Sequence, residues 1–184
     1  MHVAPRLLDG PLILRAATRL DAHPITRILR EGADDGLVTR SDEVDAGAVS
    51  RQIELARAAA NSLYVVAALP GDNPLQPDDD EVVGLLLLEG APLHRLHDVA
   101  RLTMAVASAH RNKNIGRRMM QYAMEVADAS GRIRKIELLT RANNATAIHL
   151  YTSLGFAVEG RLAARLRLDD GSFLDDVCMA RFKP

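Results

Sequence analysis

Two periods of hydrophobic residues alternate along this chain, and each predicts one type of element. Apolar residues three or four positions apart predict helices, whereas short apolar or alternating runs predict strands. The helical spacing is found in residues 21–31, 45–60, 114–129 and 145–154. The strand-like runs are residues 12–17, 63–69, 81–88, 97–108, 134–140, 156–168 and 172–182.

Capping and turn residues support the ends of several of these elements. Asp21 is the predicted N-cap of the first helix, and Pro24 is tolerated in the first turn. Gly155 stands where the end of the fourth helix needs a left-handed residue. The acidic, turn-rich residues 70–80 and the DDG turn at 169–171 each predict a hairpin between neighbouring strands.

The order of the elements, β-α-α-β-β-β-α-β-α-β-β, predicts the fold class. A mixed sheet with helices on both faces fits this order, so we expect an α/β (α+β) fold. The chain has no internal repeat, and its 184 residues are typical of one domain. We therefore expect a single domain over residues 1–184, with a short irregular N-terminal extension at 1–11.

Composition and charge narrow the possible partners. Hydrophobic residues make up 48% of the chain but aromatic residues only 3%, so the core is built from aliphatic residues and Met. The net charge is -1 and the pI is near 6.6. Nucleic-acid and membrane surfaces call for a basic excess, so neither is expected as the main partner.

The cysteine count and the lack of long apolar runs indicate the compartment. Cys178 is the single cysteine, so it can form neither an internal disulfide nor a multi-cysteine metal site. This favours a reducing compartment. The N-terminus has no uninterrupted apolar core typical of a signal peptide, and the run VVGLLLL is too short to span a bilayer. We expect a cytoplasmic protein.

The segment HRNKNIGRR, residues 110–118, has the pattern of an anion-binding turn. A strand followed by a basic turn and a helix start presents free backbone amides and a positive helix end. Asn114 stands where a left-handed glycine would be convenient, and Gly116 permits close approach of a ligand. The local potential is raised by Arg111, Lys113, Arg117 and Arg118. The alternative is that Asn114 is only an N-cap and the arginines form a solvated face.

A second segment, LLTRANNATAIHLYTSLGFAVEG at residues 138–160, combines a strand, an Asn-started helix and a further strand. Together with TMAVASAHRNKNIGRRMM it closely resembles the GNAT superfamily of acyl-CoA-dependent N-acetyltransferases. The family's loop pattern Q/R-x-x-G-x-G/A corresponds to Arg111, Asn112, Lys113, Asn114, Ile115 and Gly116. Its helix pattern N-x-x-A-x-x-L-Y-x-x-x-G-F is met by Asn144, Ala147, Leu150, Tyr151, Gly155 and Phe156. The tail, residues 159–182, looks like the bacterial branch that acetylates free amino acids and related small amines.

The resemblance implies a fold and a cofactor. It implies a mostly antiparallel sheet of about seven strands, splayed between the fourth and fifth and flanked by about four helices. Acetyl-CoA should lie in the splayed opening and serve as the acetyl donor, and no metal should be needed. The backbone of Met104, Ala105 and Val106 should pair with the pantetheine arm. Amides from Asn112 to Arg117 should hold the pyrophosphate.

The resemblance also implies catalytic roles. Asn144 would contact the pantetheine arm, Tyr151 would protonate the departing thiolate, and the amide of Met104 would stabilise the oxyanion. Two alternatives stay open: Asn144 as only a helix N-cap, and Tyr151 as a core tyrosine with a satisfied hydroxyl. The side chains of Met104, Met119 and Met120 are expected in the core.

Arg101 departs from the family pattern. Many relatives have a Glu or Asp near this place that relays a proton from the substrate amine, and an arginine cannot act as that base. Candidates for the proton relay are His97 and Asp98 at the start of the same strand and His94 in the preceding turn, with an exposed turn as the alternative for the histidines. Arg101 could instead bind a substrate carboxylate bidentately.

The acceptor is expected among the first two helices and their loop, residues 31–43, the third-to-fourth-strand turn and the final hairpin. Asp34, Asp35, Asp42 and Glu43 could attract a cationic amine or simply form a solvated loop. The expected reaction is acetyl transfer from acetyl-CoA to a primary amine of a small molecule, with an amino acid as one candidate. The alternatives are a protein or peptide N-terminus as acceptor, or a non-catalytic acyl-CoA-binding module. A homodimer is a further expectation, since dimers are common in similar proteins.

Overall fold

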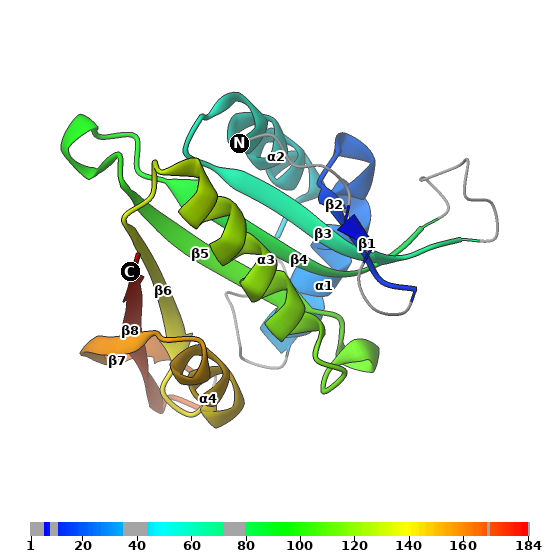
Figure 1. Ribbon diagram of the computed structural model, residues 1–184. Coiled ribbons are helices and arrows are strands. Elements are labelled where there is room, and N and C mark those ends of the chain that lie inside the picture. Colours follow the sequence, from blue (N-terminus) through cyan, green and yellow to red (C-terminus); the bar gives the residue numbers. More distant parts are fainter. Residues whose placement is uncertain (1–5, 8–10, 35–43, 72–79, 169, 184) are drawn as a thin grey trace.

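The computed structural model describes residues 6–7, 11–34, 44–71, 80–168 and 170–183, and shows one eight-stranded sheet with helices on both faces (Figure 1). The strands are β1 (Arg6–Leu7), β2 (Ile13–Ala16), β3 (Leu63–Leu69), β4 (Glu81–Gly90), β5 (Val99–Val106), β6 (Lys135–Arg141), β7 (Ala157–Arg167) and β8 (Phe173–Phe182). The helices are α1 (Ala22–Asp34), α2 (Ala46–Ala58), α3 (Ile115–Ser130) and α4 (Ala145–Ser153). The sheet order is β1-β2-β3-β4-β5-β6-β8-β7, and every neighbouring pair is antiparallel except β5 and β6.

The predicted strands and helices are all present, and the α/β (α+β) class is confirmed. One difference lies in the N-terminal stretch that was expected to be irregular. Arg6 and Leu7 form the short strand β1, which pairs with Leu14 and Ile13 at the edge of the sheet. A strand of two residues has no repeat from which a period can be read, so the pattern of hydrophobic residues did not predict it.

The start of the first helix was predicted wrongly in one detail. Asp21 is not its N-cap but the last residue of a short 3-10 turn that leads into α1. Its carboxylate accepts hydrogen bonds from the backbone N–H of Thr18 at 2.7 Å and from both terminal nitrogens of Arg15, at 2.8 and 2.9 Å. Asp21 therefore closes a capping box three residues downstream of Thr18 while neutralising a partly buried arginine.

The two faces of the sheet carry separate hydrophobic clusters. On one face α3 buries Ile115, Met119 and Met120 against the strands, as expected for the apolar side of this helix. On the other face α1 and α2 bury residues such as Ile28 and Ile53 (Figure 1). In the described ranges, none of the helices is both long and apolar enough to cross a membrane.

The sheet splits between β5 and β6. These strands pair in parallel only from Val99 to Leu102, opposite Lys135 to Leu138. Beyond that point β5 continues to pair with β4, and β6 continues to pair with β8. Figure 1 shows the two halves diverging, with α3 over one and α4 beside the other. The predicted splay between the fourth and fifth predicted strands, which are β5 and β6, is confirmed.

An ion pair holds the end of β6 in the second half. Arg141 Nη1 lies 2.5 Å from Asp176 Oδ1 on β8, directly opposite in the strand register. The two side chains are only 13% and 5% exposed, and Arg141 Nε is buried without a partner among the described residues. A guanidinium in such surroundings needs its carboxylate, since an uncompensated buried charge is costly.

Removal of this carboxylate should therefore destabilise the fold. We expect Asp176→Ala to lower the free energy of unfolding by about 3–5 kcal/mol, the cost typical of breaking a buried pair. Urea denaturation followed by circular dichroism measures the change. Arg161→Ala is the control, because this side chain pairs with Asp175 on the same strand but is 65% exposed, so it should shift the midpoint far less. Equal midpoints for the two variants would contradict this role.

Candidate active site

The edge of β5 that faces the split carries unpaired backbone groups. The N–H of Ala107 donates to Val83 O on β4 at 2.9 Å, so Ala107 directs its backbone groups towards β4. Successive residues of a strand point their N–H and C=O groups to opposite sides. Met104 and Val106 therefore direct theirs away from β4 and into the split. In agreement, Val106 O accepts from Arg111 Nε at 3.2 Å rather than from the sheet.

The turn between β5 and α3 has the left-handed backbone that the sequence predicts. Asn114 has φ 61° and ψ 8°, and Asn112 also has φ 61°. Asn114 occupies the N-cap position, but its side chain makes no capping hydrogen bond, so the capping alternative explains little. The first helical bond runs from Arg118 N to Asn114 O at 3.1 Å. The amides of residues 115–117 precede this bond and are left without helical partners at the positive end of α3.

Gly116 lies where α3, β5 and α4 converge. A Cβ atom at this position would come 3.3 Å from Met104 Cε and 3.7 Å from Leu150 Cδ2. The first distance is already a tight contact, so any larger side chain would occupy the mouth of the split. The absence of a side chain thus keeps the first turn of α3 accessible beside Met104.

Basic side chains surround this turn in different ways. Arg111 is tied to the end of β5, as described above. Arg117 Nη2 donates to Ser153 Oγ at 2.9 Å and so links α3 to α4 across the split. Lys113 is exposed and has no polar partner among the described residues. Its ammonium group is thus available to an anion bound at the turn.

Asn144 caps α4 through its side-chain oxygen, and its side-chain NH2 group is left to donate elsewhere. Its Oδ1 accepts from Ala147 N at 3.1 Å, so the N-cap alternative is confirmed as one role of this residue. The side-chain NH2 group has no partner in the part of the chain that the structure describes. Because the cap fixes the amide, this NH2 is held in a defined orientation and can donate to a ligand.

Tyr151 lies in the core, but its hydroxyl is not satisfied there. The residue is 7% exposed, its ring packs 5.9 Å from that of Phe156, and its hydroxyl has no hydrogen-bond partner among the described residues. Burial raises the pKa of Tyr151 to about 12, so the phenol is neutral at physiological pH. Gly155, with φ 86°, ends the helix as predicted, and Phe156 N donates to Tyr151 O at 3.1 Å. This helix end fixes the backbone of Tyr151.

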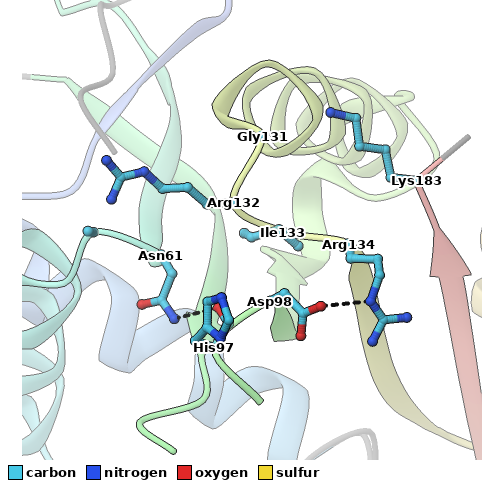
Figure 2. Close-up of a pocket in the computed structure, with 9 residues that line it drawn as sticks. Asn61, His97, Asp98, Gly131, Arg132, Ile133, Arg134 and Lys183 are labelled. Atoms are coloured by element: carbon cyan, nitrogen blue, oxygen red, sulfur yellow. Dashed lines mark hydrogen bonds and ion pairs between the residues drawn. The ribbon is translucent and has the colours of Figure 1, made fainter. Parts of the chain in front are cut away.

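The histidines proposed as proton relays lie elsewhere. His94 and His97 are exposed and precede β5, at the opposite end from Met104, so the exposed-turn alternative is confirmed for both. Asn61 donates to His97 O at 3.1 Å, beside a pocket of about 660 Å³. Figure 2 shows this contact among the residues that line the pocket. Asp98 pairs with Arg134 Nε at 2.7 Å, and this hydrogen bond holds the pKa of its carboxyl below the usual value. None of these groups reaches the split.

A different pocket adjoins the split, on the face covered by α1 and α2. It has a volume of about 720 Å³ and is lined by α2, the β4–β5 connection and the paired ends of β5 and β6. Arg101 and Glu137 both line it, with Arg101 Nη2 3.9 Å from Glu137 Oε1. Sequence reasoning missed Glu137, although it is an acidic residue within the otherwise largely apolar strand KIELL.

Some of the segments that the sequence analysis placed around the acceptor line this pocket. They are α2, the β4–β5 connection and, from the final hairpin, Phe182. Asp34 is the last residue of α1, and Asp35, Asp42 and Glu43 lie outside the described residues. Within the described ranges, no group of three or more His, Cys, Asp or Glu side chains is placed to hold a metal ion.

Comparison with known sequences gives a family and several similar proteins. The model of the "Acetyltransferase (GNAT) family" matches residues 48–156, which is more than half of the chain. L-amino acid N-acetyltransferase AaaT of Escherichia coli (strain K12) is 32% identical over 105 residues, or 57% of this chain and 64% of that protein. Spermidine N(1)-acetyltransferase of the same strain is 30% identical over 84 residues, or 46% of this chain and 44% of that protein. The chain thus spans less than two thirds of the length of either relative.

Comparison with solved structures supports the fold. A GNAT-family acetyltransferase from Streptococcus pneumoniae superposes with a TM-score of 0.81 at 20% identity, over 93% of this chain and 99% of that one. The structure of yncA from Salmonella typhimurium with its cofactor acetyl-CoA gives 0.79 at 19% identity, over 94% of both chains. The family match covers the split strands, the turn at Asn114 and the helix that carries Tyr151, and the chain therefore belongs to the GNAT acetyltransferase family.

Proposed function

We propose that this protein transfers an acetyl group from acetyl-CoA to a primary amine of a small molecule. The observation that carries this proposal is the edge of β5, where Met104 and Val106 turn backbone groups without strand partners into the split next to the amide-rich turn at Asn114. Such an edge suits a ligand with amide groups of its own and a phosphate-bearing end. The yncA structure, which has the same fold, is described with acetyl-CoA as its cofactor.

The residues around the split fit acetyl-CoA. The amides of residues 112–117, with Lys113 and Arg117 nearby, would hold the pyrophosphate. The backbone groups of Met104 and Val106, with Ala105 between them, would pair with the pantetheine arm, and the NH2 group of Asn144 would donate to it. Gly116 would leave room for the arm to pass. When bound, acetyl-CoA would supply an acetyl thioester.

Two groups of this chain are placed to assist the transfer. The N–H of Met104 would donate a hydrogen bond to the thioester oxygen as negative charge develops there. Tyr151 would give its proton to the departing sulfur. Since burial raises the pKa of Tyr151 to about 12, this phenol keeps its proton throughout the neutral and mildly alkaline range. Any loss of activity below about pH 10 would then come from another group.

The pocket beside Arg101 would receive the acceptor. Its volume of about 720 Å³ is in the range typical of small-molecule sites, which favours a small amine over a protein N-terminus. Arg101 lines it with a side chain that is 64% exposed and only loosely paired, so its guanidinium can still bind a carboxylate. This favours an amino acid, the acceptor class named for AaaT, over spermidine, the acceptor named for the other relative.

Thiol release from acetyl-CoA with a panel of acceptors tests the function. We expect turnover with amino acids, and weaker turnover with the corresponding amino-acid amides, which lack the carboxylate for Arg101. Polyamines and N-terminal peptides complete the panel. Turnover with peptides alone would favour the protein-directed alternative. Binding of acetyl-CoA without turnover of any acceptor would favour the non-catalytic binding module.

The role of Tyr151 has its own test. We expect Tyr151→Phe to lower kcat by about 10-fold or more while the Kd for acetyl-CoA stays nearly unchanged, because only the acid is lost. Steady-state kinetics and isothermal titration calorimetry provide the two numbers. Tyr64→Phe is a matched control, since Tyr64 is also buried but belongs to the cluster under α1 and α2. An unchanged kcat in Tyr151→Phe, under conditions where chemistry limits the rate, would refute the acid role.

A further inference from the structure

A row of charged side chains crosses the sheet just before it splits. The strand register places Glu89 on β4 opposite Arg101 on β5, and Arg101 opposite Glu137 on β6. Partners in register share a face of the sheet, and all three residues line the pocket under α2. Glu137 directly precedes Leu138, whose pairing with Leu102 is the last before the two strands part. Of the two carboxylates in the row, Glu137 is thus the one at the split.

Two cationic side chains lie near the Glu137 carboxylate without donating a hydrogen bond to it. Arg101 Nη2 lies 3.9 Å from Oε1 and Lys135 Nζ lies 3.7 Å from Oε2. Both distances exceed hydrogen-bonding range, and neither oxygen accepts a hydrogen bond from another described residue. The side chain is 37% exposed and lines the pocket, so a ligand or a water can reach it.

We propose that Glu137 receives the proton that the acceptor's ammonium group must lose before it can attack, an inference that rests on the function proposed above. Met104, whose N–H faces the reacting carbonyl in that proposal, lies three residues beyond Arg101, which is about 10 Å along β5. A glutamate side chain from the Glu137 position and a bridging water cover this distance, with the amine between them.

With Glu137 as the first proton acceptor, every proton of the transfer is accounted for. The ammonium N–H bond breaks and its proton passes through water to Glu137 and on to solvent. The nitrogen lone pair then forms the C–N bond, and the C–S bond breaks as the sulfur takes the proton of Tyr151. The second proton leaving the nitrogen restores Tyr151 through water. No oxidant, reductant or metal enters the balance.

The other candidate acids and bases that the structure describes around β5 are placed less well. Glu89 lies on β4, with β5 and Arg101 between it and the split. Asp98 is engaged by Arg134 (Figure 2). His94 and His97 precede β5, at the end far from Met104. Arg101 itself has no basic form at physiological pH. In this proposal a carboxylate on β6 accepts the proton, because β5 has an arginine where many relatives have an acidic residue.

The test is the pH dependence of kcat/KM in Glu137→Gln. At neutral pH we expect a loss of about 100-fold, within the range for removal of a general base, with an unchanged Kd for acetyl-CoA. The deficit should narrow as the pH rises, because the acceptor then arrives already deprotonated. Glu159→Gln is the matched control: Glu159 is the other carboxylate on Lys135, at 2.7 Å, and lies outside the pocket, so its kcat/KM should stay at the wild-type value.

Three outcomes would overturn the inference. If Glu137→Gln keeps wild-type kcat/KM at every pH, the proton goes elsewhere. A deficit of the same size at every pH would show that Glu137 only shapes the pocket. If the wild-type protein turns over no amine at all, the proposed acetyl transfer fails and this role fails with it. The first two outcomes leave acetyl transfer intact, so the two failures are distinguishable.

Discussion

The site depends on a strand edge that the sheet leaves unpaired. Backbone N–H and C=O groups inside a protein need partners, and nearly all of them find one. β5 loses its neighbour after Leu102, yet it continues to Val106 along β4. Met104 and Val106 therefore face a space that a ligand with its own amide groups can fill. The polar groups of the split are placed by the backbone, so they tolerate changes of side chain.

The two halves of the sheet contribute different parts of the site. The β5 half carries the turn at Asn114 and the first turn of α3, which present amides to an anion. The β6 half carries α4, with the cap residue Asn144 and the phenol of Tyr151. Besides the short β5–β6 ladder, side-chain links between them include Arg117 with Ser153 and Arg181 with Asp128, while Arg141 and Asp176 bind β6 to β8. The geometry between amide turn and phenol thus depends on how these halves are fastened.

Local patterns predicted most of the elements and the backbone of single residues, but not the relations between distant strands. Asn114 and Gly155 were correctly expected to be left-handed, because the need for positive φ follows from the immediate neighbours in the chain. Whether His97 and Asp98 could act in the site depended on which end of β5 lies at the split. The local spacing of hydrophobic residues does not predict this. Glu137 was missed for the same reason, since its place opposite Arg101 follows from the register of a parallel pair about 35 residues apart in sequence.

Hydrogen exchange of single backbone amides, followed by NMR, tests the central claim most directly. Without ligand, the amides of Met104 and Val106 should exchange faster than that of Ala105, which faces β4. Saturating acetyl-CoA should slow Met104 and Val106 selectively and leave Ala105 nearly unchanged, because only the edge that faces the split gains partners. If acetyl-CoA binds and the exchange of Met104 and Val106 does not change, the ligand does not pair with this edge and the account is wrong.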